Sequence, residues 1–404
     1  MAVSRKDPKG RKLNDGESWR SDGRYCYRYT DPATGKRNAL YASDLPQLRI
    51  KEKKLEKDLE DGLLTGTASQ KMTLNALFEY YLETRVLSDT TRVNYTHLWN
   101  RRVRDEIGMM KVVLIRPSHI KRYYAKLSQE GYAHATIKNL HGLIHPSLKL
   151  AVEDDLIRKN PADCALGDYG RKTEERKPLT VSQQESLLEF VKNSNIYNVY
   201  HPMLVIMLET AVRCGELIGL TKHDIDFKEK TVSIDHQLIY RNWGDGCNFH
   251  ITLPKTDAGI RMIPMTNAVA KAFKQQRKIN LMTAKDKSIT IDGYSGFLFT
   301  AKSGKPLMPG AVNNILYNIV DAYNKAELEK AKKERRKAKL MPKFSAHVLR
   351  HTACTRMAEK RIDIKVLQYI MGHASADVTM NVYNHVADRD RIISEIARLD
   401  SITG

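Results

Sequence analysis

The sequence predicts a mostly α-helical protein with small antiparallel β elements, arranged in three domains. Strand-like alternation near the N-terminus is followed by a segment whose apolar residues recur at helical spacing, and short strands then interrupt a mainly helical remainder. Two polar stretches, residues 62–71 and 167–178, separate these parts. We therefore expect domains at residues 1–66, 72–165 and 178–404.

The first domain is predicted to be a thin three-stranded sheet followed by a helix. Turn residues divide residues 17–42 into three strands, and a charged helix is expected over residues 44–62. In the middle strand, alternation places Arg24 and Arg28 on one face and three tyrosines on the other. This arginine-bearing face could enter a DNA groove. The alternative is the exposed face of a minor sheet.

The second domain is predicted to be a bundle of about four helices. Thr73 is a candidate N-cap, because it precedes an apolar stripe of helical spacing. Ser118 stands before a second stripe in the same manner, and Asn160-Pro161 closes the segment. The stripes consist of Leu74, Leu77, Phe78, Tyr81 and Leu82, of Ile120, Tyr123, Tyr124 and Leu127, and of Ile137, Leu140, Leu143, Ile144 and Leu148.

The third domain is predicted to be mainly helical, with one small antiparallel sheet. A charged run over residues 322–339 reads as a solvated helix or excursion, and we assign it no role. The expected strands are Thr231–Ile234, Gln237–Tyr240, Phe249–Leu253 and Ile260–Pro264.

The charge of the chain favours a nucleic acid as partner. The 404 residues include 67 Lys and Arg against 47 Asp and Glu, a net charge of +20, and the excess is spread over the whole length. A basic protein of another kind, such as a ribosome-associated one, is the alternative. The five scattered cysteines suit reduced thiols in a cytoplasm, and neither a secretory signal nor an apolar run long enough for a membrane is found.

The last third of the chain contains residue types suited to phosphodiester cleavage. That reaction requires a nucleophile, cations that offset the charge on the phosphorus and an acid for the leaving oxygen. His347 and Arg350 stand three apart in a predicted helix, His373 follows a glycine, and Tyr383 comes ten residues later. We find no zinc-ligand spacing, no HExxH arrangement and no Walker sequence. Metal and nucleotide cofactors are therefore not expected.

Two upstream segments add further cations. Arg213 is followed three residues later by Glu216, which could brace it. Lys255 lies near the tip of a predicted hairpin over residues 254–261. Each of these motifs, taken alone, is more often a surface ion pair, a packing residue or an exposed turn. The interpretation depends on the order and spacing of all of them together.

This joint pattern resembles the tyrosine recombinases, also called lambda-type integrases. The resemblance rests on TAVRCGEL, PKTDAGIRMIP, HVLRHT, YIMGH and TMNVYNH. The thin N-terminal sheet and the segments DGYSGFLF and SIDHQL look like integrases of conjugative transposons, also called integrative and conjugative elements. Met371 departs from the family, in which leucine commonly precedes Gly-His. The two side chains are close in volume, so the chemistry is not put in doubt.

The resemblance implies a role for each of these residues. Tyr383 would be the nucleophile, and its 3′-phosphotyrosine would conserve the bond energy needed for rejoining without ATP. Arg213 and Arg350 would clamp the non-bridging phosphate oxygens. Lys255 would reach the minor groove and protonate the departing 5′ oxygen. His347 would hydrogen-bond the phosphate and help deprotonate the tyrosine. His373 would hydrogen-bond a phosphate oxygen.

The resemblance also implies partners. The first domain would bind arm-type DNA sites, the second the core site, and the third would be catalytic. Double-stranded attachment-site DNA would be bound by a homotetramer in the bacterial cytoplasm, at the nucleoid, with an excisionase and a host DNA-bending protein as further candidates. An apolar stripe after Tyr383 would either dock on a neighbouring protomer or pack on its own domain; it consists of Ile392, Ile393, Ile396 and Leu399.

Two other functions fit part of the pattern. A type IB topoisomerase shares the nucleophile and the arginine clamp, but a separate sheet domain before a helical bundle favours an integrase. A non-catalytic DNA-binding protein could keep the fold, but the complete set of cations and the tyrosine argues against it.

Overall fold

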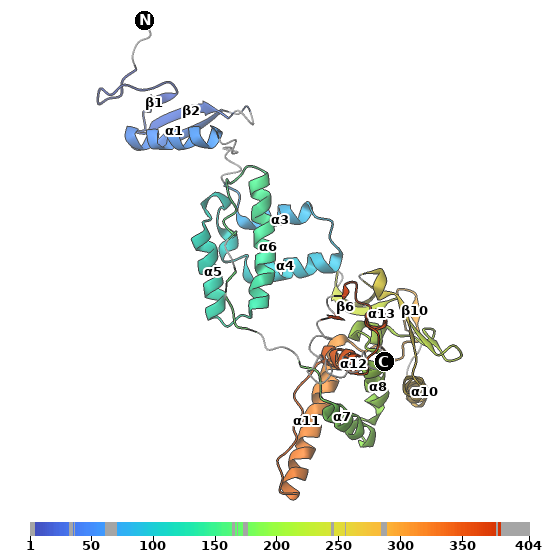
Figure 1. Ribbon diagram of the computed structural model, residues 1–404. Helices are drawn as coiled ribbons and strands as arrows, with labels where there is room; N and C mark the ends of the chain where they lie inside the picture. Colours follow the sequence, from blue (N-terminus) through green and yellow to red (C-terminus); the bar gives the residue numbers. More distant parts are fainter. Residues whose placement is uncertain are drawn as a thin grey trace, which may run out of the picture. The chain divides into compact units, whose positions relative to one another are not determined.

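The computed structural model consists of two compact units, Met1–Glu174 and Glu175–Gly404 (Figure 1). No helix among the described residues is long and apolar enough to cross a membrane. The residues described are 5–31, 35, 37–60, 71–163, 166–167, 169–172, 177–243, 246–254, 256–283, 289–376 and 379–380.

The first unit begins with the predicted thin sheet. Strands β1 (Glu17–Trp19), β2 (Tyr25–Thr30) and β3 (Arg37–Ala42) are antiparallel in the order β1-β2-β3, and α1 (Leu45–Glu60) packs on the sheet. The register pairs Tyr25 with Ala42 and Tyr27 with Leu40, so this part of one face is apolar and contacts the helix. The small core consists of Leu13, Tyr25, Ala42, Leu45 and Leu48.

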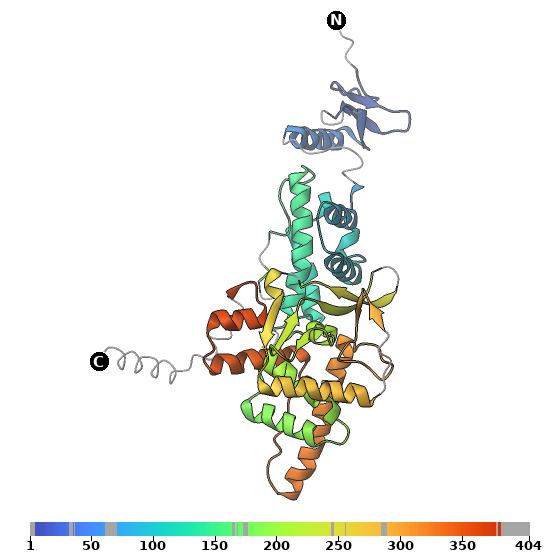
Figure 2. The same ribbon diagram turned by 90° about the vertical axis from the view of Figure 1, so that its right-hand side faces the viewer.

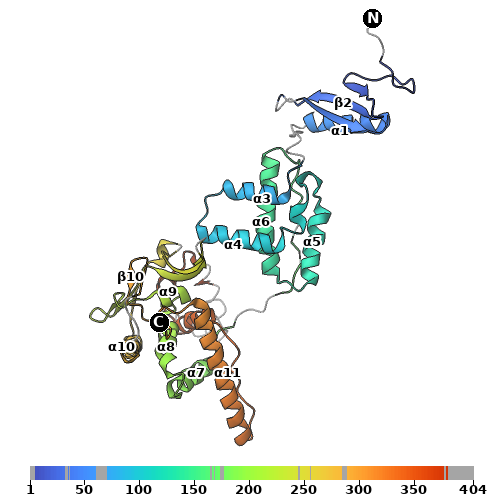
Figure 3. The same ribbon diagram turned by 180° about the vertical axis from the view of Figure 1, so that it is seen from behind.

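Four α-helices form the rest of the described first unit, as predicted (Figure 3). The Thr73 side chain accepts a hydrogen bond from the Ala76 amide at 3.3 Å and caps the first helix. The expectation for Ser118 was wrong: the third helix begins at Pro117, whose fixed φ suits the first helical position, and Arg116 is the N-cap. The helices are α3 (Leu74–Glu83), α4 (Asp89–Arg102), α5 (Pro117–Gln129) and α6 (His134–Glu153), with short 3-10 turns η1 (Ile107–Met109) and η2 (Val112–Leu114).

The second unit is mainly helical (Figure 2). Its largest core cluster is apolar and spans most of its helices, and α8 contacts both α10 and α12. The helices are α7 (Val181–Asn193), α8 (His201–Thr210), α9 (Cys214–Gly219), α10 (Asn267–Met282), α11 (Pro309–Lys333), α12 (Ala346–Glu359) and α13 (Ile364–Met371), with the 3-10 turns η3 (Asn198–Tyr200) and η4 (Asp257–Gly259).

The predicted strands of the second unit are present, but they form two sheets and not one. Asp235 and His236 separate β5 from β6. The His236 ring is buried and lies 2.9 Å from the Gly219 carbonyl. The sheets are β4 (Ile225–Asp226), β5 (Thr231–Ile234) and β8 (Arg261–Pro264); β6 (Gln237–Asn242) and β7 (Cys247–Thr252); and a short pair, β9 (Thr290–Ile291) and β10 (Tyr294–Ser295).

The charged run over residues 322–339 is partly packed and not wholly solvated. It forms the second half of α11, and the chain then returns along that helix. Glu327 is buried on the helix, and Arg336 from the returning segment donates to both of its oxygens at 2.5 and 3.2 Å. The Lys339 amide donates to the same carboxylate at 2.9 Å. The run therefore builds a fixed hairpin.

Candidate active site

Arg213 lies where α8 passes into α9. Helix α8 ends on Ala211, which has a left-handed backbone with φ of 54°, and Arg213 is the N-cap of α9. Its amide and its guanidinium donate to the two carboxylate oxygens of Glu216 at 2.8 and 2.7 Å. Glu216 thus braces Arg213, as the sequence suggested. The Arg213 side chain remains 39% exposed, so it can still reach a ligand.

Arg350 is supplied by α12 and is almost completely buried. Its guanidinium donates to the Ala211 carbonyl at 2.6 Å and to the Met371 carbonyl at 2.5 Å. His347 stands three residues earlier in the first turn of the same helix, and its side chain is exposed. The predicted helix therefore carries both residues.

Three arginines converge on the C-terminal end of α13. Arg261 donates to the Ile370 carbonyl at 2.7 Å, and Arg213 donates to the Gly372 carbonyl at 2.9 Å. Together with Arg350 they bond the carbonyls of three consecutive residues. The last carbonyls of a helix have no partners within the helix and carry partial negative charge, so guanidinium groups suit them. We call Arg213, Arg261 and Arg350 the arginine cluster.

Arg261 was not singled out from the sequence. It opens β8, and strand alternation puts it on the inner side with Ile263 while Met262 between them is exposed. This alternation is the one local signal that could have identified it. Its guanidinium donates to both oxygens of Glu216, at 3.2 and 2.9 Å.

The electrostatics of the cluster favour an anion. Arg213 and Arg261 both pair with the single Glu216 carboxylate, so with Arg350 the cluster holds three positive charges against one negative charge. Burial, and then the charge of Arg213, lowers the pKa of Arg350 to about 9. Burial would raise the pKa of Glu216, but the hydrogen bonds and charges of its arginine partners hold that pKa below its ordinary value. A phosphate oxygen would relieve the repulsion among the arginines.

His373 follows directly on the left-handed Gly372 that ends α13. Its Nδ1 lies 3.0 Å from the Thr379 hydroxyl, and Gln368 donates to its carbonyl at 3.1 Å. Burial, and then the charges of Arg350 and Arg213, lowers the pKa of His373 to about 4. The imidazole is therefore neutral near pH 7 and can donate or accept one proton.

The structure brings Arg213, Glu216, Arg350 and His373 together around the end of α13. Lys255 and Tyr383 lie outside the described residues. The turn after Lys255 is η4, and its Gly259 carbonyl accepts a hydrogen bond from Arg261 at 2.8 Å.

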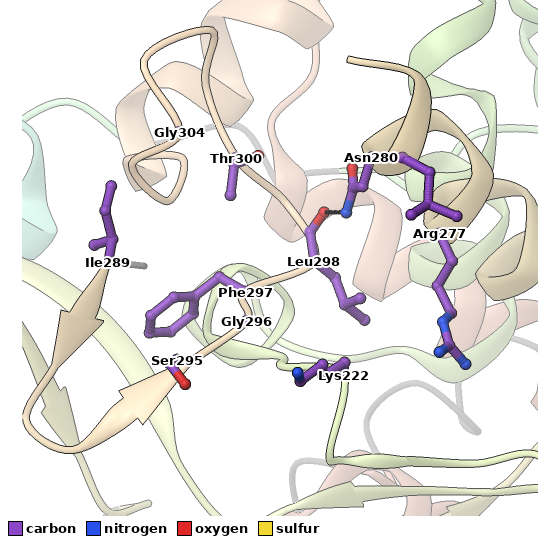
Figure 4. A pocket seen from close by; sticks show the side chains of 11 residues that line it. Lys222, Arg277, Asn280, Ile289, Ser295, Gly296, Phe297, Leu298, Thr300 and Gly304 are labelled. Carbon is purple, nitrogen blue, oxygen red and sulfur yellow. Dashed lines mark hydrogen bonds between the residues drawn. The ribbon is translucent and has the colours of Figure 1, made fainter. Parts of the chain in front are cut away.

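Two other features of the second unit are separate from the cluster. A cavity of about 190 Å³ is lined by Lys222, Arg277, Phe297 and other residues, none of which belongs to the arginine cluster (Figure 4). Among the described residues, Asp224, Asp235 and His236 form the one group whose ligand atoms lie close enough for a metal ion. The two His236 nitrogens already face Asp235 and the Gly219 carbonyl.

The arginines predicted to read DNA lie on β2 and just before it. Arg28 is exposed on β2, opposite Ala39 of β3. Arg24 donates to Asp22 at 2.7 Å and stands 5.5 Å from the ring centroid of Tyr41. Arg20 lies over the same ring at 5.4 Å. The sequence reasoning missed Arg20 and Tyr41, because their contact with Arg24 is made across strands.

Comparison with known proteins decides the family. Residues 177–390 match the model of the phage integrase family, which is more than half of the chain. The chain belongs to this family. Two further models match this integrase: the DNA-binding domain of Tn916 integrase over residues 1–59, and the N-terminal SAM-like domain of phage integrases over residues 73–128.

Full-length relatives confirm the conjugative-transposon branch. The integrase is 35% identical to the transposase from transposon Tn1545 of Streptococcus pneumoniae, with 99% of this chain and 98% of the relative covered. It is 34% identical to the transposase from transposon Tn916 of Enterococcus faecalis, with the same coverage. The protein is a tyrosine recombinase, a site-specific DNA integrase, and the topoisomerase alternative is not favoured.

Solved structures of integrases support the same assignment. The Tn1549 transposon integrase in complex with transposon right end DNA matches with a TM-score of 0.71 and 33% identity, over 81% of this chain and 100% of that chain. A lambda integrase tetramer bound to a Holliday junction matches with a TM-score of 0.53 and 18% identity, over 94% of this chain and 97% of that one. At 18% identity, the likeness to the lambda integrase concerns the fold alone. The predicted fold class is confirmed.

Proposed function

We propose that this integrase cleaves attachment-site DNA by attack of the Tyr383 phenolic oxygen, with the scissile phosphate held by Arg213, Arg350 and His373. The observation that carries the proposal is the convergence of the arginine cluster on the end of α13, which leaves uncompensated positive charge beside the partly exposed Arg213. A buried excess of guanidinium groups is unfavourable unless an anion binds there.

The reaction balances without a cofactor. The phenolic oxygen attacks phosphorus, the bond to the 5′ oxygen breaks, and a 3′-phosphotyrosine remains. Lys255 supplies a proton to the departing 5′ oxygen, and His347 helps to remove the phenolic proton. The ordinary pKa of tyrosine is near 10, so nearby cations also assist ionisation. A 5′ hydroxyl from another strand then attacks in the reverse sense and restores the tyrosine.

The three parts of the chain would divide the work. Residues 1–66 bind arm-type sites through the face that bears Arg24 and Arg28, residues 72–165 bind the core site, and residues 178–404 catalyse. The matches to a Tn916 DNA-binding domain and to a SAM-like domain support this division. A homotetramer on DNA at the bacterial nucleoid, assisted by an excisionase and a host DNA-bending protein, completes the proposal.

A covalent-adduct assay tests the proposed nucleophile. The wild-type integrase is mixed with a nicked attachment-site suicide substrate, and protein–DNA adducts are counted on a denaturing gel. Tyr383→Phe is expected to bind the DNA with unchanged Kd and to form no adduct, because the attacking oxygen is gone. EDTA is expected to leave the wild-type adduct unchanged. Adducts with the phenylalanine variant, or their loss in EDTA, would contradict the mechanism.

A further inference from the structure

Arg261 links three parts of the active site, although the proposed reaction gives it no contact with DNA. Its side chain is fully buried, and its guanidinium bonds Glu216, the Gly259 carbonyl and the Ile370 carbonyl. Burying a guanidinium is costly unless its donors find good partners. The hydrogen-bond partners of Arg261 therefore indicate which groups this residue holds in place.

The first link runs through Glu216 to Arg213. Arg213 and Arg261 donate to the same carboxylate: Arg213 at 2.7 and 2.8 Å, through side chain and amide, and Arg261 at 3.2 and 2.9 Å. Because four donors fix both oxygens, the carboxylate has one orientation. The long Arg213 side chain is partly exposed and would otherwise sample several rotamers.

The second and third links run to α13 and to the turn after β7. The Ile370 carbonyl, 2.7 Å from Arg261 Nε, lies three residues before His373. The Gly259 carbonyl, 2.8 Å from Arg261 Nη1, belongs to η4, which begins two residues after Lys255. The fit is close, because a Cβ on Gly372 would come within 2.9 Å of Arg261 Nη1.

We propose that Arg261 is a positioning residue for strand cleavage. It acts through Glu216 on Arg213, and through the two carbonyls on the segment that carries His373 and on η4. The inference rests on the proposed function. It requires a guanidinium, since a lysine ammonium is a single point and cannot span these three acceptors.

The first measurement is the rate of adduct formation by Arg261→Met and Arg261→Lys on the suicide substrate. A displacement of about 1 Å in a positioned group lowers rates about 100-fold, so we expect a loss of that order with unchanged Kd for the DNA. Lysine is expected not to restore the rate. A wild-type rate in Arg261→Met would overturn the proposal.

A second substrate separates positioning from general loss of structure. A methylphosphonate at the scissile position lacks one anionic oxygen, so it depends less on a correctly placed Arg213. We expect the loss in Arg261→Met to be clearly smaller on the methylphosphonate than on the phosphodiester. An equal loss on both substrates would show a merely structural role.

Arg336→Met is the matched control. Arg336 donates to both oxygens of the buried Glu327 in the α11 hairpin, as Arg261 does to Glu216. The bonds between Arg336 and Glu327 do not involve the arginine cluster. We expect this control to lower the melting temperature and to keep the wild-type adduct rate. If Arg261→Met lowered the rate no more than Arg336→Met, positioning would be refuted.

A double variant guards against failure to fold. Arg261→Met with Glu216→Gln removes the buried charges together, and the same dependence on substrate is expected from it. The two proposals fail differently. If the wild-type protein forms no adduct, the proposed function is wrong; if it does and the Arg261 variants match it, only this inference is wrong.

Discussion

The Arg350 guanidinium donates a hydrogen bond to the backbone carbonyl of Met371 at 2.5 Å, across 21 residues of sequence. Arg350 is placed by α12 and Met371 is the last residue of α13, so the bond ties the arginine that we propose to hold the phosphate to the segment that presents His373. The geometry of α13's last turn and that of the arginine cluster therefore depend on each other.

Gly372→Ala is expected to damage both stability and cleavage. Gly372 has φ of +60°, and an added Cβ would lie 2.9 Å from Arg261 Nη1 and 3.0 Å from the Ala258 carbonyl. The left-handed backbone alone costs an L side chain roughly 1–2 kcal/mol. We expect a loss of at least this size in the free energy of unfolding. The adduct rate should fall about 10-fold or more, because the arginine must move.

Gly310→Ala is the control for that substitution. Gly310 lies in the first turn of α11, and a Cβ there meets nothing within 4 Å. Alanine is the better helix former, so stability should be equal or higher. Similar behaviour of the two alanine variants would contradict the strain assigned to Gly372.

His373→Gln is expected to make the protein less sensitive to acid. The pKa of His373 is lowered to about 4, whereas an unfolded histidine titrates near 6.5. Between these values the folded state binds fewer protons than the unfolded state, so stability falls as pH falls from 6.5 towards 4. Glutamine has no such titration. Between pH 7 and pH 5, the free energy of unfolding should fall by about 1–2 kcal/mol less in the variant than in the wild type, as measured by denaturant unfolding.

Arg28→Ala is expected to weaken binding to arm-type DNA without affecting core-site cleavage. Arg28 is exposed on β2, and α1 covers the other face of the sheet. Loss of one direct base or phosphate contact should raise the Kd for arm DNA about 10-fold, as measured by fluorescence anisotropy. Lys54→Ala, exposed on α1, is the control and should bind as wild type.

Deletion of residues 1–66 should remove arm binding and keep core-site adducts. A loss of core-site adducts would refute this division of labour.

Glu52→Gln is expected to stabilise the N-terminal sheet at alkaline pH. Burial, and then the charge of Glu17, raises the pKa of Glu52 to about 7. The folded state therefore holds a proton that the unfolded state releases near pH 4.5, and stability falls as pH rises from about 4.5 to 7. At pH 8 the variant should gain about 3 kcal/mol in the free energy of unfolding. Hydrogen exchange of the β2 amides in the full chain measures the gain. No gain at pH 8, or the same gain at pH 5, would contradict the assignment.

Local sequence patterns predicted most of the elements. Apolar stripes predicted the helices of the first unit, the HxxR spacing placed His347 and Arg350 on one helix, and Thr73 was recognised as a cap. These features depend on residues within a few positions of one another. The same local reasoning was wrong for Ser118, because the neighbouring proline sets the helix start.

The sequence by itself determined which residue types were present for phosphodiester chemistry and in what order, and the family followed from that order. Only the tertiary structure decided that the strands of the second unit form two sheets, that Arg261 shares Glu216 with Arg213, and that three arginines meet at the end of α13. The physical reason is separation along the chain: Arg261 is 45 residues from Glu216 and 109 from Ile370. Contacts at such distances arise from packing and leave no periodic pattern in the sequence.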